Sequence, residues 1–498
     1  MSRNSARWWA AVVALCVVLL APLLIVDVPP LLDYPNHLAR VLVLASLPND
    51  PVLARFYAAR WSIIPNLAVD LVGPPLVHVL PVHVVGRLLV AVALLLPVGG
   101  TIAYHAALGG RWWSLGVGLA AYNSSLLAGF LNFEIGIGLA LLLAAGWLRW
   151  REDRPLRAIA LAVPGAIALF ACHLMGLVFF GVLIGSAELV GVWRNPRSWR
   201  GAVLVLIFAT PVGLYLVSEL RQLGGDAVFL PLRPKLLQLA ATFVNYHWPL
   251  DLVTAGFALV MPAACLLLRF GRVPAPASIA YLLLLTGFAA APYAWKATYA
   301  LDARFAVMLG FMVFAGFVPE RWPTGFRRVL VSGLSLLFVG RMALLMTAWT
   351  AHRADLADVR AALGPVRPGQ AVYVAEAGLQ EAPAYWGANP RWRLLSNGAR
   401  TDEHLGALAL IEHRAYWPFE FDNRSQQPVE TREPYRGLAE RVGFLPDRAQ
   451  AAVADVCGFD YVLLQGADAV PGLPADRFRL LVRSGFAALY AVIRCEDR

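Results

Sequence analysis

Long apolar runs alternate with short polar segments over the first 349 residues of the chain. A helix needs about 20 predominantly apolar residues to cross a bilayer. The runs that approach this length lie at residues 8–28, 87–108, 112–131, 134–149, 157–172, 174–193, 201–218, 248–268, 276–292, 305–319 and 328–349. The pattern predicts a polytopic α-helical membrane protein with about 11 transmembrane helices over residues 1–349. Several runs are short, so the count of helices could differ by about two.

Arginine residues mark one end of these runs. The segments assigned to that side carry Arg3, Arg7, Arg111, Arg149, Arg151, Arg154, Arg157, Arg194, Arg197, Arg200, Arg269, Arg272, Arg321, Arg327 and Arg328. Because short basic loops stay in the cytoplasm, we expect a multi-pass protein of the bacterial inner membrane with a cytoplasmic N-terminus. The first run resembles a signal peptide, but its length favours a retained helix. Residues 29–86 then form the first extracytoplasmic loop.

The polar tail at residues 350–498 has a different pattern. Short apolar segments that are typical of strands lie at residues 371–374, 461–464, 478–482 and 487–493, and segments that favour helices lie at 353–363 and 448–456. The tail is therefore expected to form a C-terminal extracytoplasmic α/β domain. Cys457 precedes one strand and Cys495 follows another. Outside the cytoplasm a disulfide between them is one expectation, and two unpaired thiols are the alternative.

Composition narrows the functional classes. Hydrophobic residues make up 59% of the chain and charged residues only 15%, whereas about a quarter of the residues in soluble proteins are charged. The net charge of +10 does not indicate a nucleic-acid partner, because the arginines lie in short loops between apolar runs. The chain has no C-x-x-C pair for a zinc site, no phosphate-binding loop for ATP-driven transport and no Gly-x-Ser-x-Gly motif of serine hydrolases.

The segment Pro29–Arg40 carries several polar and ionisable side chains at the predicted edge of the membrane. It places Asp33, Asn36, His37 and Arg40 directly after the first apolar run. In a continuous helix Asp33, His37 and Arg40 would share one face, although Pro35 favours a break and Asn36 could cap a helix that starts near His37. We interpret the segment as a reaction or ion-binding site at the water–lipid boundary. The alternative is a solvated connector.

Further polar residues fall on the same predicted side of the bilayer. They are Asn66, Asp70, Asn132, Glu134, His173, His247, Lys296, Asp302 and Arg304. Ionisable groups at membrane depth usually face a cavity or a partner, so we expect one water-filled pocket. The alternatives are local: Asn66 and Asp70 could cap the next helix, His247 could belong to an aromatic belt, and Lys296, Asp302 and Arg304 could form a salt bridge among lipid headgroups.

These residue types suit the transfer of a group from a lipid-linked phosphate. Asp33 can act as general base toward a hydroxyl, or can bind a divalent metal ion together with His37. Lys296 and Arg304 can hold a phosphate. The candidate catalytic residues are Asp33, His37 and Glu134. The candidate substrate-binding residues are Asn36, Arg40, Asn66, Asp70, Asn132, His173, His247, Lys296, Asp302 and Arg304.

The chain resembles the GT-C superfamily of membrane glycosyltransferases, which includes protein O-mannosyltransferases and aminoarabinose transferases. The shared features are an acidic first outer loop with Asp33, an adjoining amphipathic helix, about eleven crossings and an outer α/β domain. The resemblance implies a polyprenyl-phosphate sugar donor, an inverting transfer, Asp33 as base and Arg304 as a phosphate ligand. The acceptor that the resemblance implies is a glycan, a lipid or a protein.

The sequence departs from that superfamily in one motif. Many members carry paired acids in the first loop, whereas here Asp33 is followed by Tyr34-Pro35-Asn36-His37. The need for a metal stays open, as does the source of a second acid, Asp70 or Glu134. The alternative functions are a transporter or flippase of a lipid-linked or anionic substrate, and an assembly protein whose outer domain binds a partner.

Overall fold

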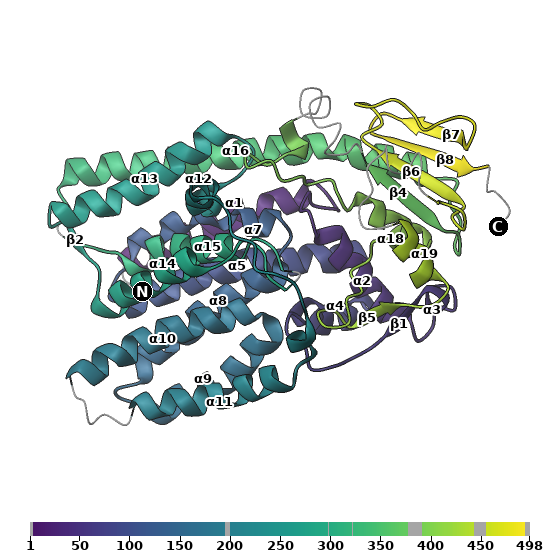
Figure 1. Ribbon diagram of the computed structural model, residues 1–498. Coiled ribbons are helices and arrows are strands. Elements are labelled where there is room, and N and C mark those ends of the chain that lie inside the picture. The colour runs from purple at the N-terminus through teal and green to yellow at the C-terminus, as the bar shows by residue number, and fades with distance from the viewer. Residues whose placement is uncertain are drawn as a thin grey trace. The chain divides into compact units, whose positions relative to one another are not determined.

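The structure of the 498-residue chain is a computed structural model. It describes residues 3–194, 200–296, 298–320, 322–376, 391–442 and 455–493. The chain divides into two compact units, and each combines separate stretches of sequence (Figure 1). Unit 1 comprises Met1–Leu24, Ile63–Ala68 and Leu88–Met346, and unit 2 comprises Ile25–Ser62, Val69–Arg87 and Thr347–Arg498. Most of the predicted first loop therefore belongs to the same unit as the tail.

Helices form at ten of the eleven predicted apolar runs. They are α1 (Arg3–Leu20) with the 3-10 turn η1 (Ala21–Leu24), α5 (Val82–Ala107), α8 (Leu131–Trp150), α9 (Pro155–Cys172), α10 (Leu174–Arg194), α11 (Arg200–Val217), α13 (Trp248–Leu267), α14 (Ala275–Ala290), α15 (Leu301–Gly316) and α16 (Thr324–Leu363). Within the described residues, seven helices are long and apolar enough to cross a membrane by length and composition. The expected polytopic helical membrane protein is confirmed.

The run at residues 112–131 is not a single helix, so that expectation was wrong. It consists of η2 (Trp112–Val117), α6 (Gly118–Ala121) and α7 (Ser124–Leu127). Asn123 explains the break, because its side-chain oxygen accepts the backbone N–H groups of Ser125 at 2.8 Å and Leu126 at 3.1 Å. A buried asparagine that satisfies free N–H groups lets the backbone turn inside an apolar region.

Helix α16 also differs from expectation. The sequence predicted a last span at residues 328–349 and a separate helix at 353–363, but one helix of 40 residues runs from Thr324 to Leu363. No proline or glycine interrupts residues 341–363, so the helix continues without a break. The connection between α11 and α13 contains η3 (Glu219–Gln222), α12 (Leu232–Leu237) and η4 (Gln238–Phe243). Strands β2 (Gly271–Arg272) and β3 (Val318–Pro319) pair in unit 1.

Unit 2 is built around a four-stranded sheet. Strands β4 (Val372–Glu376), β6 (Tyr461–Gln465), β8 (Ala487–Val492) and β7 (Phe478–Ser484) lie side by side in that order (Figure 1). Strands β4 and β6 are parallel and the other two pairs are antiparallel. The four predicted strands are therefore confirmed. Most of the helix predicted at residues 448–456 lies outside the described residues.

The first-loop segments of unit 2 pack with the C-terminal elements. They form α2 (Tyr34–Ser46), α3 (Leu53–Phe56), β1 (Tyr57–Ala59) and α4 (Ala68–Val77), and the tail adds η6 (Arg391–Arg393), η7 (Leu405–Ala407), α18 (Leu408–His413), β5 (Val429–Thr431) and α19 (Tyr435–Val442). Strand β1 pairs antiparallel with β5, and α18 packs on α2. Cys457 is disulfide-bonded, whereas Cys495 lies outside the described residues.

Candidate active site

Helix α2 begins earlier than the sequence suggested. It starts at Tyr34, with Pro35 in its first turn and Asp33 at the N-cap position. Proline is favoured there because its missing N–H would have no helical partner. The expectation that Asn36 caps the helix was therefore wrong. The Asp33 side chain makes no capping hydrogen bond to a described residue, so its carboxylate is not used to hold the helix end.

Asn36 joins α2 to the C-terminal part of unit 2. Its Nδ2 donates to the carbonyl of Phe419 at 2.8 Å, and its Oδ1 accepts the N–H of Phe421 at 3.0 Å. The side chain is fully buried. A buried amide with both groups paired fixes the backbone it holds, so Asn36 sets the position of residues 419–421 against α2. Its candidate role in substrate binding stays a prediction.

Arg40 and Asp70 form a buried ion pair. Arg40 Nε lies 2.6 Å from Asp70 Oδ1 and Nη2 lies 3.2 Å from Oδ2, and both side chains are fully buried. Arg40 Nη2 also lies 2.9 Å from His37 Nδ1. The sequence therefore placed His37 and Arg40 together correctly on one face of α2. Asp70 is the partner of Arg40 in this pair, so it does more than cap a helix.

His404 lies beside Asp33, and the sequence pattern did not single it out. Its Nε2 is 3.4 Å from Asp33 Oδ1, with His404 itself only 3% exposed. The ring packs edge-on against Phe421, at 5.3 Å between centroids, and against Trp417 at 6.1 Å. Its Nδ1 is buried with no hydrogen-bond partner within the described part of the chain. The contact comes from tertiary folding, so no local sequence signal could have predicted it.

Glu420 is a second residue that the sequence analysis missed. It lies in the segment that Asn36 holds, is 4% exposed, and neither carboxylate oxygen has a hydrogen-bond partner among the described residues. Burial raises the pKa of the Glu420 carboxyl well above its usual range, although the Arg40 guanidinium opposes that shift. The protonated form of Glu420 is therefore favoured over what a solvent-exposed glutamate would show.

The candidates in unit 1 form a separate group around the starts of α8 and α10. Asn132 Nδ2 donates to the carbonyl of Asn66 at 2.7 Å, and the N–H of Leu67 donates to the carbonyl of Ala171 at 2.7 Å. Asn66 has a φ of +73°, a left-handed conformation that asparagine adopts more readily than most residues. These bonds fasten residues 66–67 to α8 and α9.

His173 and Arg304 meet within this group. Arg304 Nη1 lies 2.9 Å from His173 Nε2, and the N–H of Met175 donates to His173 Nδ1 at 3.0 Å. A neutral imidazole has one acceptor nitrogen and one N–H. The Met175 N–H and the Arg304 guanidinium thus approach the two ring nitrogens of His173 from opposite sides of the ring. The Arg304 guanidinium also lies over the rings of Phe130 at 4.7 Å and Phe133 at 5.5 Å.

Glu134 lies in the first turn of α8 and is 1% exposed. Asn123 hydrogen-bonds its side chain, whereas its Oε1 has no hydrogen-bond partner within the described ranges. The same asparagine that breaks the 112–131 run therefore also contacts this carboxyl. Glu134 is thus buried inside the protein, and both its expected place in a water-filled pocket and its catalytic role stay predictions.

The remaining candidates have local partners. Asp302 lies 3.8 Å from Lys235, Lys296 lies over the ring of Trp295 at 5.3 Å, and His247 caps α13 by accepting the N–H of Leu250 at 3.3 Å. Lys235, which the sequence analysis did not single out, is thus a partner of Asp302. Over the residues described, no group of three or more His, Cys, Asp or Glu side chains could hold a metal ion.

Comparisons with known proteins bear on the fold. No protein-family model and no curated protein matches the chain. Among solved structures, the chain is similar to ArnT from Cupriavidus metallidurans bound to undecaprenyl phosphate, over 99% of this chain and 98% of that chain, with a TM-score of 0.55 and 12% sequence identity. The chain has the ArnT fold. The architectural resemblance expected from the sequence is therefore confirmed, while residue roles cannot be carried over at this identity.

Proposed function

We propose that the protein is a membrane glycosyltransferase that moves a sugar from a polyprenyl-phosphate donor to an acceptor hydroxyl on the outer face of the bacterial inner membrane. The observation that carries the proposal is the likeness to ArnT over 99% of the chain, because that protein was solved with undecaprenyl phosphate bound. The arginine-rich short loops support the assignment of sides.

Asp33 acts as the general base in this proposal. It is 14% exposed, in contrast to Arg40 and Asp70, and its carboxylate is not committed to capping α2. It takes the proton of the acceptor hydroxyl while that oxygen bonds to the anomeric carbon. The bond between this carbon and the phosphate oxygen breaks, and its electron pair leaves with the polyprenyl phosphate.

His404 is a positioning residue for this step. Its Nε2 lies 3.4 Å from Asp33 Oδ1, in a buried, aromatic setting that leaves the ring little freedom. An imidazole fixed beside a carboxylate restricts the orientation of that carboxylate, which suits a base. The Arg40–Asp70 pair supports the same helix, because a buried bidentate ion pair resists rotation of α2.

Arg304 binds the donor phosphate in this proposal. The guanidinium of Arg304 lies 2.9 Å from His173 Nε2. Arginine carries five N–H donors in a fixed planar fork, which suits a phosphate. The same contacts would stabilise the negative charge that develops on the leaving phosphate.

A transfer assay tests the proposal. Purified full-length protein is incubated with polyprenyl-phosphate sugars radiolabelled in the sugar, together with a pool of glycans, lipids and peptides from the cell envelope. The expected result is label in the acceptor fraction with release of polyprenyl phosphate. Absence of transfer from every donor, with movement of the labelled lipid between the leaflets of proteoliposomes, would replace the proposal with a flippase.

A further inference from the structure

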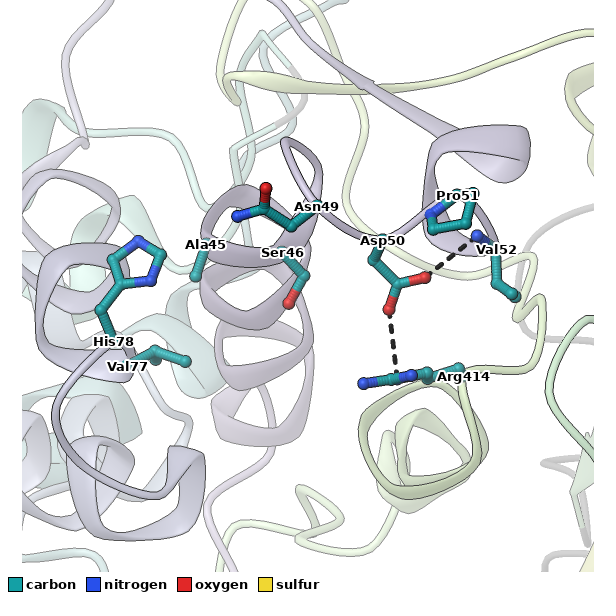
Figure 2. A pocket seen from close by; sticks show the side chains of 9 residues that line it. All are labelled: Ala45, Ser46, Asn49, Asp50, Pro51, Val52, Val77, His78 and Arg414. Carbon is teal, nitrogen blue, oxygen red and sulfur yellow. Dashed lines mark hydrogen bonds and ion pairs between the residues drawn. The ribbon is translucent and has the colours of Figure 1, made fainter.

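A polar pocket opens at the C-terminal end of α2 in unit 2 (Figure 2). Its volume is ≈ 420 Å³, within the range of small-molecule sites in proteins. The polar lining comprises Ser46, Asn49, Asp50, His78 and Arg414, set among small apolar side chains. Nothing in the proposed transfer step uses these residues.

The charges of the pocket balance. Asp50 Oδ2 lies 3.1 Å from Arg414 Nε, and Asp50 Oδ1 accepts the N–H groups of Val52 at 3.0 Å and Leu53 at 3.2 Å. The acid is thereby fixed in place and the single arginine is neutralised. An anionic ligand would have to compete with Asp50 for Arg414, and a cationic ligand with Arg414 for Asp50. The balance therefore favours a neutral ligand.

The hydrogen-bonding groups of the pocket are mixed. The Arg414 side chain is 59% exposed, so its outer N–H groups can donate to a ligand, while Ser46, Asn49 and His78 can donate or accept. Figure 2 shows His78, Asn49 and Ser46 on one side and Asp50 with Arg414 on the other. A ligand that fits must be neutral and rich in groups that both donate and accept, which describes the hydroxyls of a sugar.

The backbone of Arg414 supports a role beyond the fold. Arg414 ends α18 in a left-handed conformation with a φ of +54°. Glycine is favoured at that position because a side chain there adds steric strain. The chain keeps an arginine whose guanidinium is exposed to the pocket. Backbone strain of this kind persists where the side chain has a use.

The pocket lies far from Asp33 along the same helix. Helix α2 has 13 residues, and at 1.5 Å per residue it is about 20 Å long. Asp33 precedes its first residue, whereas Ser46 is its last. The pocket therefore cannot hold the sugar unit that reacts beside Asp33. We propose that it binds a neutral sugar residue of an extended glycan, remote from the reacting hydroxyl, so that α2 spans several sugar units of the acceptor.

The identification of the glycan as acceptor rests on the proposed function, whereas sugar binding in the pocket does not. The binding test uses full-length protein in nanodiscs and an array of neutral oligosaccharides of one to several residues, spanning the common hexoses and pentoses. At least one longer oligosaccharide should bind. Because the loss of hydrogen bonds from a charged donor weakens binding by roughly 10-fold or more, Arg414→Gly should reduce that affinity by this factor, and Asn49→Ala should also weaken it.

The variants separate binding from folding. Glycine fits the conformation of residue 414 without strain, which offsets the loss of the ion pair with Asp50. Arg414→Gly should therefore largely keep the melting temperature while the affinity for the oligosaccharide falls. Arg424→Ala is the matched control, because Arg424 is exposed, pairs with Glu430 and does not line the pocket. No binding anywhere on the array would overturn the proposal. A lower melting temperature with unchanged binding in Arg414→Gly would overturn it as well, and would assign the residue to the fold.

Kinetics keep this inference distinct from the proposed function. Arg414→Gly should raise KM for a long acceptor and leave kcat unchanged, with no effect on a monosaccharide acceptor. If Asp33→Asn abolishes transfer while Arg414→Gly leaves KM unchanged for every acceptor length, the transferase proposal is supported and the acceptor subsite is contradicted. If oligosaccharides bind at Arg414 but no transfer occurs with any donor, sugar binding in the pocket is supported and the transferase proposal is contradicted.

Discussion

At the scale of single residues, the candidate site depends on how each carboxyl is partnered. Asp33 meets an imidazole at 3.4 Å and keeps some exposure, Asp70 is fully paired with Arg40, and Glu420 is buried with no hydrogen-bond partner among the described residues. One chemical group thus has three environments within one unit. Only the first leaves a carboxylate that is accessible from outside the protein, which is what a general base needs.

His404→Ala tests the positioning of Asp33. Removing the imidazole leaves the carboxylate free to rotate, so kcat for sugar transfer should fall by about 10- to 100-fold, part of the contribution of a positioned base, with KM for the donor unchanged. His404→Gln, which keeps an N–H donor, should restore much of the rate. His413→Ala on α18 serves as control. Equal losses in the Ala and Gln variants would contradict a hydrogen-bonding role.

Glu420→Gln tests the buried carboxyl. Because burial raises the pKa of Glu420 in the folded state, the folded protein binds this proton more tightly than the unfolded chain, in which glutamate titrates near pH 4. Proton binding therefore stabilises the fold fully below about pH 4, and this stabilisation is lost as pH rises toward the folded pKa. Glutamine needs no proton, so the variant should gain on the order of 1 kcal/mol over the wild type at pH 8, and little at pH 4.

Thermal unfolding of both proteins at pH 4, 6 and 8 measures this difference. The neighbouring Arg40–Asp70 pair is present in both proteins, so its contribution cancels in the comparison. Parallel pH profiles for wild type and Glu420→Gln would mean that the pKa of Glu420 is the same in the folded and unfolded states, and would contradict the raised pKa.

At the scale of elements, helices α8 and α10 position the candidates of unit 1. Glu134 lies in the first turn of α8, and His173 immediately precedes α10. The two helices approach at Gly136 and Gly176, where a Cβ on Gly176 would lie 2.8 Å from the Cα of Gly136. Small residues at such crossings let helix backbones meet inside membranes.

Gly176→Ala should separate α8 from α10. The clash is with backbone atoms, which cannot rotate away, so the variant should lose about 1–3 kcal/mol of stability and bind the donor more weakly. Gly185→Ala in the same helix is the matched control, because no described atom lies within 4 Å of its added Cβ. Thermal unfolding and donor binding are measured for both. Equal behaviour of the two variants would contradict close packing at Gly176.

The sequence predicted the elements better than it predicted the site. Apolar length and arginine spacing located the helices, and short apolar segments located the four strands, because both signals are local. The break at Asn123 escaped notice, since one asparagine in an apolar run does not reveal which N–H groups it accepts. His404 and Glu420 could not be predicted for a related reason. They matter because they lie near Asp33, at the N-cap of the distant helix α2, and Arg40 within it, and only folding brings these residues together.

At the scale of the whole molecule, the chain is similar to ArnT in fold but shares little of its sequence. The chain matches ArnT over nearly its full length with a TM-score of 0.55, at 12% identity. A polytopic helical unit requires apolar length and small residues at crossings rather than specific side chains, so the architecture persists while most positions change. Unit 2 gathers its candidate site from both the predicted first loop and the tail, and its chemistry must therefore be tested on the full chain.

The most direct test of the account is single-turnover transfer by Asp33→Asn compared with wild type. Both proteins are first saturated with radiolabelled polyprenyl-phosphate sugar, whose Kd is measured separately, and acceptor is then added. Asp226→Asn, in an exposed loop, is the control. The account predicts an unchanged Kd and a transfer rate lower by roughly 10²- to 10⁴-fold in Asp33→Asn. Transfer at the wild-type rate by Asp33→Asn would contradict the account.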